Sequence, residues 1–264
     1  MSTRRRFLAT VAGVASAALL TAGVTTAAAG PAHHSTPKPT VVLIHGAFAD
    51  GSSWNEVSER LQRDGYQVVV PAVPLRSIAT DTTYLTGVLA GIPGPKVLVG
   101  HSYGGALITQ LAGAPGVKSL VYVAAYIPQA GENLGDLTAK YPGSEIGPDT
   151  TNTITYAGGA DLVMKPESFR QVFAADLPRK QAALLGASQR PVSASVFGET
   201  VAKSAPANLP KYAVVATGDK AIPPAGERFM AKRAKATIVE VNASHLVALS
   251  QPEKVTNLIE RATR

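Results

Sequence analysis

The sequence contains no cysteine, and few of its residues are charged. Of its 264 residues, 16% are Asp, Glu, Lys or Arg, and 6% are aromatic. Without cysteine the chain forms no disulfide and no thiolate metal site, and it cannot be lipid-anchored through a cysteine. Its hydrophobic content of 45% is enough to bury one full core. The composition therefore predicts a single globular domain that needs no disulfide.

The first 29 residues lack acidic side chains and differ from the rest of the chain. Three arginines, Arg4 to Arg6, precede an Ala/Gly/Val/Leu stretch that ends in three alanines at Ala29. A charged start, an apolar middle and a small-residue end are typical of a secretory signal peptide, and T-R-R-R-F-L resembles the twin-arginine export signal. We therefore expect residues 1–29 to be a cleaved signal peptide of a secreted or periplasmic protein, which contacts a membrane only during export.

An uncleaved anchor over residues 7–29 is the alternative to a signal peptide. The Ala, Gly and Thr residues of this segment gain little from lipid, which disfavours the anchor. Residues 30–39 are rich in Pro, Ser, Thr and Gly and are expected to form a flexible linker. The pair His33-His34 lies in this linker, so we discount it as a metal site.

No part of the chain clusters Lys and Arg with interleaved aromatic residues. The net charge is +7, and three of these charges belong to the arginines of the signal segment, which leaves +4 scattered over the remainder. Scattered charge favours solubility, so no nucleic-acid partner is expected.

From Thr40 onward, short β-branched runs alternate with amphipathic stretches. Continuous apolar runs indicate a parallel sheet that is buried on both faces. The predicted strands are residues 40–44, 67–70, 96–99, 120–123, 212–216 and 237–241. The predicted helices are residues 53–63, 81–90, 103–112 and 253–264. This alternation predicts an α/β class fold, a mostly parallel doubly wound sheet, over residues 40–264.

Residues 127–208 interrupt the alternation with scattered Pro and Gly. Helical patterns remain at 166–173 and 178–185. An insertion of this size between two core strands is interpreted as a cap over the carboxyl edge of the sheet.

The motif G-x-S-x-G stands at residues 100–104, directly after an apolar strand and before a helix. This context predicts a nucleophile elbow, in which Gly100 and Gly104 leave room for a strained Ser102. The N–H of Tyr103, at the helix start, points to an oxyanion site. The alternative is an ordinary glycine-rich turn, which the flanking strand and helix disfavour.

A second oxyanion donor is expected after the first strand. His45-Gly46-Ala47 follows that strand, and the glycine permits close approach of the Ala47 N–H. We expect His45 to hold this loop through hydrogen bonds rather than to act as a base, and we interpret His101 as structural.

The residues that would activate Ser102 lie late in the chain. Asp219 and His245 each follow a late predicted strand, so both loops leave the sheet at the same edge as Ser102. His245 is the only histidine after Ser102, which makes it the expected general base. Asp219 is the expected orienting acid, with a turn aspartate as the alternative.

Apolar side chains near these motifs are candidates for a substrate pocket. They are Phe48, Trp54, Tyr126 and Ile127, with Phe169 and Phe173 from the cap. Trp54 and the Tyr103 ring could equally belong to the core.

Five ordered motifs resemble those of the α/β-hydrolase superfamily, in the branch of plant methyl-ester esterases and hydroxynitrile lyases. They are H-G-A with Ser53-Trp54 downstream, G-H-S-Y-G-G, A-G-E-N-L at 130–134, G-D-K-A-I-P at 218–223, and A-S-H near Q-P-E at 251–253. The resemblance covers almost all of the chain after the linker and implies the α/β-hydrolase fold. In this branch the D-K-x-I-P string carries the triad acid, which implies this role for Asp219.

Two positions depart from the lyases of this branch. The lyases usually have Thr where this sequence has Gly46, and Lys where it has Leu246. Both departures favour an esterase. We expect cleavage of small carboxylic esters without a metal or organic cofactor; lyase, lactonase or perhydrolase chemistry, or a binding protein on a hydrolase scaffold, are the alternatives.

Overall fold

A parallel six-stranded sheet forms the centre of the computed structural model, which describes residues 37–264. Its strands are β1 (Thr40–Ile44), β2 (Val68–Val69), β3 (Lys96–Ser102), β4 (Val117–Ala125), β8 (Lys211–Ala216) and β9 (Thr237–Val241). All residues of β1 and β3 are buried, which is why these strands read as continuous apolar runs. The predicted α/β class and parallel sheet are confirmed. The expected signal peptide and most of the linker lie outside the described residues.

The order of the strands is β2-β1-β3-β4-β8-β9. The chain first adds β2 on one side of β1 and then continues from β3 in the other direction. Parallel sheets bind ligands beyond the carboxyl ends of the strands at such a reversal. The reversal lies between β1, which leads into Gly46, and β3, which ends at Ser102.

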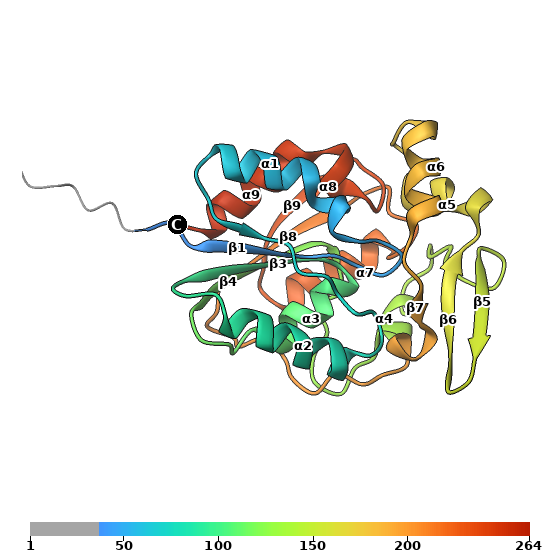
Figure 1. The fold of residues 1–264 in the computed structure, drawn as a ribbon, viewed down its shortest axis with the longest axis horizontal. Helices are drawn as coiled ribbons and strands as arrows, with labels where there is room; N and C mark the ends of the chain where they lie inside the picture. The colour runs from blue at the N-terminus through green and yellow to red at the C-terminus, as the bar shows by residue number, and fades with distance from the viewer. Residues whose placement is uncertain (1–36) are drawn as a thin grey trace, which may run out of the picture. The chain divides into compact units, whose positions relative to one another are not determined.

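Helices cover both faces of the sheet (Figure 1). One layer holds α1 (Asn55–Arg63), α8 (Val247–Ser250) and α9 (Pro252–Ala262), and the 3₁₀ turn η1 (Gly51–Trp54) leads into α1. The other layer holds α2 (Ile78–Ala90), α3 (Tyr103–Leu111) and α7 (Pro224–Arg233). Each layer packs its apolar face on the sheet, so two separate hydrophobic clusters form. None of the described helices combines the length and apolar character needed to cross a bilayer.

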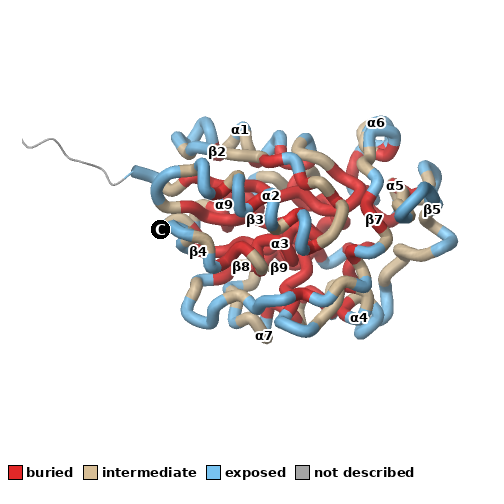
Figure 2. The backbone as a smooth tube through the Cα atoms, turned by 60° about the horizontal axis from the view of Figure 1, so that its bottom comes forward, coloured by how far each residue is buried: buried red, intermediate tan, exposed pale blue. Residues whose placement is uncertain are grey.

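The chain between β4 and β8 builds a separate set of small elements. They are α4 (Leu134–Ala139), β5 (Thr151–Tyr156), β6 (Gly159–Met164), α5 (Pro166–Phe173), α6 (Arg179–Ser188), β7 (Val192–Ser193) and the 3₁₀ turn η2 (Ala194–Phe197). Strands β5, β6 and β7 form an antiparallel sheet that the sequence did not predict. Strand β5 is almost entirely exposed (Figure 2), so it carries no apolar pattern that would have indicated a strand.

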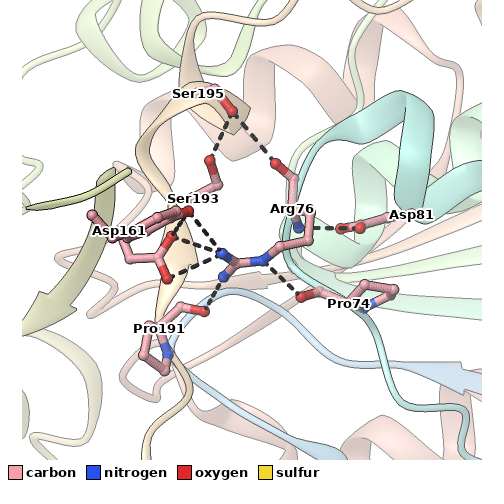
Figure 3. Close-up of polar contacts among 8 residues, drawn as sticks. Pro74, Arg76, Asp81, Asp161, Pro191, Ser193 and Ser195 are labelled. Carbon is pink, nitrogen blue, oxygen red and sulfur yellow. Dashed lines mark hydrogen bonds and ion pairs between the residues drawn. The ribbon is translucent and has the colours of Figure 1, made fainter. Parts of the chain in front are cut away.

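Arg76 joins this segment to the loop between β2 and α2 (Figure 3). Its Nη1 lies 2.8 Å from Asp161 Oδ1 on β6, and its Nη2 donates to the Pro191 carbonyl at 3.1 Å. The N–H of Ser193 on β7 donates to the Leu75 carbonyl at 2.9 Å. The small sheet is therefore attached to the core by several polar contacts at one place.

Candidate active site

Ser102 ends β3 and immediately precedes α3. Its backbone has φ 53° and ψ −120°, a conformation that costs a non-glycine residue about 1–3 kcal/mol. Such strain is typical of a sharp strand-to-helix turn that presents a nucleophile. The turn is tight: a Cβ on Gly104 would lie 2.5 Å from the Ile44 carbonyl oxygen.

The loop after β1 runs against Ser102. A Cβ on Gly46 would lie 2.7 Å from the Cβ of Ser102, so only glycine fits at this approach. Neither the Ala47 N–H nor the Tyr103 N–H donates a hydrogen bond to any described residue. Both amides are buried beside the serine, and unpaired buried N–H groups are rare outside ligand and oxyanion sites.

His45 holds this loop in place. Its Nδ1–H donates to the Gly46 carbonyl at 3.0 Å, and its Nε2 accepts from the Val73 N–H at 3.0 Å. Burial lowers the pKa of His45 to about 4, so the ring is neutral, as this pattern requires. The side chain therefore positions the backbone and has no nitrogen free to act as a base.

Asp219 and His245 meet at the carboxyl edge of the sheet. His245 Nδ1 lies 2.5 Å from Asp219 Oδ2, and both side chains are fully buried. The other carboxylate oxygen, Oδ1, accepts from the N–H groups of Ala221 at 2.7 Å and Ile222 at 3.0 Å. The Gly218 N–H donates to the Ala243 carbonyl at 3.0 Å, which ties the two loops together. The carboxylate is thus held at both oxygens.

His101 brings the histidine loop to the nucleophile. It precedes Ser102 in the chain, its Nε2–H donates to the His245 carbonyl at 2.9 Å, and the two ring centroids are 4.6 Å apart. The second ring nitrogen of His245, Nε2, is buried without a hydrogen-bond partner in the described part of the chain. This nitrogen is therefore free to accept a proton.

Aromatic rings cover His245 on the side of the inserted segment. Phe173, at the end of α5, packs edge-on against His245 with centroids 4.6 Å apart. Phe48 and Phe169 contact Phe173 at 5.6 Å and 5.5 Å. These three rings exclude water from the histidine, which strengthens its interaction with Asp219.

Tyr126 borders a cavity of about 650 Å³ within the inserted segment. Its N–H donates to the Ser102 carbonyl at 3.2 Å, and its hydroxyl is 2.6 Å from Thr138 Oγ1. Other residues of the wall come from the loop after α4, from β6 and from η2: Tyr141, Ile146, Leu162 and Phe197. A largely apolar space therefore begins at a residue bonded to the backbone of Ser102.

Two pocket candidates, Trp54 and Ile127, lie away from the cavity beside Tyr126. Trp54 is fully buried in the core between the sheet and α1, where its ring packs edge-on against His101. Ile127 follows Tyr126, but the chain turns there along α7: its N–H contacts the Met230 sulfur and its carbonyl accepts from Arg233. The Tyr103 ring also belongs to the core, where its hydroxyl donates to Asp81 at 2.9 Å.

Two acidic side chains beside the site had no sequence signal. Asp176, in the loop after α5, accepts a hydrogen bond from Ser244, the neighbour of His245. Glu227, on α7, is buried next to Asp219. Both contacts join distant segments, which no local pattern records. No group of three or more His, Asp or Glu residues within 37–264 is arranged to hold a metal.

A family model for the "Alpha/beta hydrolase family" matches residues 41–258. The chain belongs to the α/β-hydrolase family. The match spans both loops that flank Ser102 and the loops of Asp219 and His245.

Two curated proteins that resemble the chain are an esterase and a hydrolase. A carbendazim hydrolyzing esterase of Nocardioides sp. is 35% identical over 113 residues, which are 38% of this chain and 47% of that esterase. A pyrethroid hydrolase of Sphingobium wenxiniae is 26% identical over 242 residues, 83% of this chain and 85% of the relative.

The solved structures that match include a plant-type relative. The crystal structure of polyneuridine aldehyde esterase superposes with a TM-score of 0.72 at 19% identity, over 85% of this chain and 99% of that one. At this identity the likeness shows the shared fold. The resemblance inferred from the motifs is confirmed: the family match shows an α/β-hydrolase, and the esterase and hydrolase among the curated relatives support an enzyme of the carboxylesterase type.

Proposed function

We propose that this protein hydrolyses small carboxylic esters through an acyl-enzyme on Ser102. The observation that carries the proposal is the convergence of a strained serine, two unpaired amide N–H groups and a buried His–Asp pair at one sheet edge. The names of the relatives, an esterase and a pyrethroid hydrolase, support ester substrates. Ser102 is the proposed nucleophile, His245 the general base and Asp219 the residue that orients the histidine.

The reaction begins when Ser102 Oγ attacks the ester carbonyl and its proton passes to His245 Nε2. The N–H groups of Ala47 and Tyr103 stabilise the negative oxygen of the tetrahedral intermediate. The bond to the alcohol breaks as His245 returns the proton to the leaving oxygen. Water then attacks the acyl-enzyme with His245 again as base. The bond between the acyl carbon and Ser102 Oγ breaks as His245 returns the proton to Oγ, and the carboxylic acid leaves.

The cavity beside Tyr126 supports a substrate with a sizeable apolar group. Pockets of roughly 300–1,000 Å³ hold drug-sized ligands, and this cavity of about 650 Å³ falls within that range. The hydroxyl groups of Thr138 and Ser144 add polar contacts to its wall. Larger acyl or alcohol groups are therefore proposed to extend from Ser102 past Tyr126.

A p-nitrophenyl ester series from acetate to octanoate tests this function in the chain that starts at Gly30. We expect turnover, with kcat/KM higher for the longer acyl groups, and stoichiometric labelling of Ser102 by an organophosphate probe. Heat-denatured protein is the control and should not react. Labelling without ester turnover would favour lyase or perhydrolase chemistry on the same serine. Absence of both would contradict the proposal and favour a binding protein.

We further propose that the protein is exported by the twin-arginine route and acts outside the cytoplasm. The arginine-led apolar segment of residues 1–29 supports this location. The protein recovered from the periplasm or medium should begin near residue 30, as read by N-terminal sequencing. Retention in the cytoplasm with an intact N-terminus would contradict export.

A further inference from the structure

Glu227 is a buried carboxyl group that the proposed reaction does not use. It lies on α7 and is 2% exposed. Its Oε2 accepts from the N–H of Ala216, the last residue of β8, at 3.2 Å. Its Oε1 is buried and has no N–H or hydroxyl partner among the described residues. An ionised carboxylate in such a place would be costly to bury.

Glu227 and Asp219 are both hydrogen-bonded to the same residue of the sheet edge. The Ala216 N–H donates to Glu227 Oε2 at 3.2 Å, and the Ala216 carbonyl accepts from the Asp219 N–H at 3.1 Å, so the free Oε1 of Glu227 is next to the Asp219 carboxyl group. Two carboxyl groups form a hydrogen bond only if one of them carries a proton. Asp219 already accepts from Ala221, Ile222 and His245, a pattern that suits a carboxylate. Burial, and the charge of Asp219, raise the pKa of Glu227 well above its ordinary value. The proton therefore belongs to Glu227.

Within residues 37–264, the other ionisable groups near Glu227 and Asp219 neither donate a hydrogen bond to this pair nor form an ion pair with it, apart from His245. Burial raises the pKa of the Tyr126 hydroxyl, and the carboxyl groups of Asp219 and Glu227 raise it further, so this phenol is neutral. Arg228 points away to an exposed ion pair with Glu240 at 2.7 Å, and Lys220 pairs with Glu145 at 2.8 Å. Arg228 is the cation whose charge acts on Glu227, and His245 is the ion-pair partner of Asp219.

We propose that Glu227 is a positioning residue, whose protonated carboxyl group donates a hydrogen bond to Asp219 and moderates the negative charge that Asp219 presents to His245. The inference rests on the proposed triad. A fixed donor on Asp219 helps to hold the carboxylate beside the imidazole. It also weakens the attraction between the Asp219 carboxylate and the imidazolium that forms when His245 takes the proton of Ser102.

Glu227→Gln and Glu227→Leu separate this role from simple packing. Gln reproduces the protonated side chain, because its carbonyl accepts from Ala216 and its NH₂ donates to Asp219. Leu removes both hydrogen bonds at similar volume. We expect Gln to keep kcat/KM within about threefold and to keep the pH profile. We expect Leu to lower kcat about tenfold and to move the acidic limb of kcat/KM to higher pH by about 0.5–1 unit.

The direction in which the acidic limb of kcat/KM moves shows whether the Glu227 carboxyl group is protonated or ionised. If Glu227 were ionised, Gln would remove a negative charge, and the acidic limb would move to lower pH; that result would overturn the proposal. A Glu227→Leu variant that folds but keeps its acidic limb at the same pH would also overturn the proposal. Loss of packing alone lowers the thermal stability and leaves the pH profile unchanged. If Leu fails to fold, the Gln profile decides by itself.

Failure of the triad gives a different result from failure of this inference. If the triad is wrong, the unaltered chain shows no serine labelling, or it keeps its activity when Asp219 is replaced. If only the role of Glu227 is wrong, labelling and the dependence on Asp219 remain, and the two Glu227 variants share the unaltered pH profile or depart from it in the opposite direction.

Discussion

Replacing Ser102 by Ala is expected to lower kcat for p-nitrophenyl esters by about 10⁶-fold. The substitution removes the attacking oxygen, and only binding and the two oxyanion donors remain to accelerate attack by water. Ser102 Oγ makes no hydrogen bond to a described residue, and Ala keeps the same strained φ of 53°. The thermal midpoint should therefore change little, and circular dichroism checks this alongside the kinetics.

Ser119→Ala is the matched control for this variant. Ser119 is also buried, but it lies near the start of β4, beside Val97 at the opposite end of β3 from Ser102, and its Oγ donates to the Ala262 carbonyl at 2.7 Å. We expect it to lose some stability and to keep its full kcat. A Ser102→Ala variant with activity within tenfold of the unaltered protein would place the nucleophile elsewhere.

Replacing Asp219 by Asn is expected to lower kcat by about 10⁴-fold. The Ala221 and Ile222 N–H groups require an acceptor at Oδ1, so the amide oxygen of Asn must occupy that position. The NH₂ group then faces His245 Nδ1, which becomes the acceptor and leaves the ring proton on Nε2. In this tautomer His245 cannot take the proton of Ser102.

The measurement is steady-state kcat, with the pH profile extended to high pH and the fold checked by circular dichroism. Asp136→Asn, at an exposed position near the start of α4, is the control and should retain kcat. Asp219 was also open to interpretation as a turn residue. Activity within tenfold of the unaltered protein would support that interpretation and remove Asp219 from the triad.

The buried surroundings explain why small changes at this site should have large effects. His245 and Asp219 have no exposed surface, and Phe173 closes one side of the imidazole. Electrostatic interactions are stronger in such a water-poor setting than at a surface. The contact between Ser244 and Asp176 also fixes the histidine loop to the segment that follows α5, so the cap and the base are mechanically linked.

Local sequence patterns predicted the central elements well. The strand at 40–44 and the helix at 166–173 match β1 and α5 residue for residue, because burial on both faces and an amphipathic face leave clear periodicities. Helix α2 begins at Ile78, three residues before its predicted start, since the Ser77 side chain caps it by accepting from the Thr80 N–H. The hairpin β5–β6 was missed, since an exposed strand carries no such pattern.

The sequence by itself determined the class of the fold and the residue types available for chemistry. An apolar strand, G-x-S-x-G and a helix define the turn at Ser102, and a single histidine follows it. Only the tertiary structure decided which side chains share the site. It placed Trp54 in the core, Phe173 over His245, and Glu227 against Asp219. Local patterns record the burial of one element, whereas these contacts join segments far apart in the chain, and only the packed sheet edge brings them together.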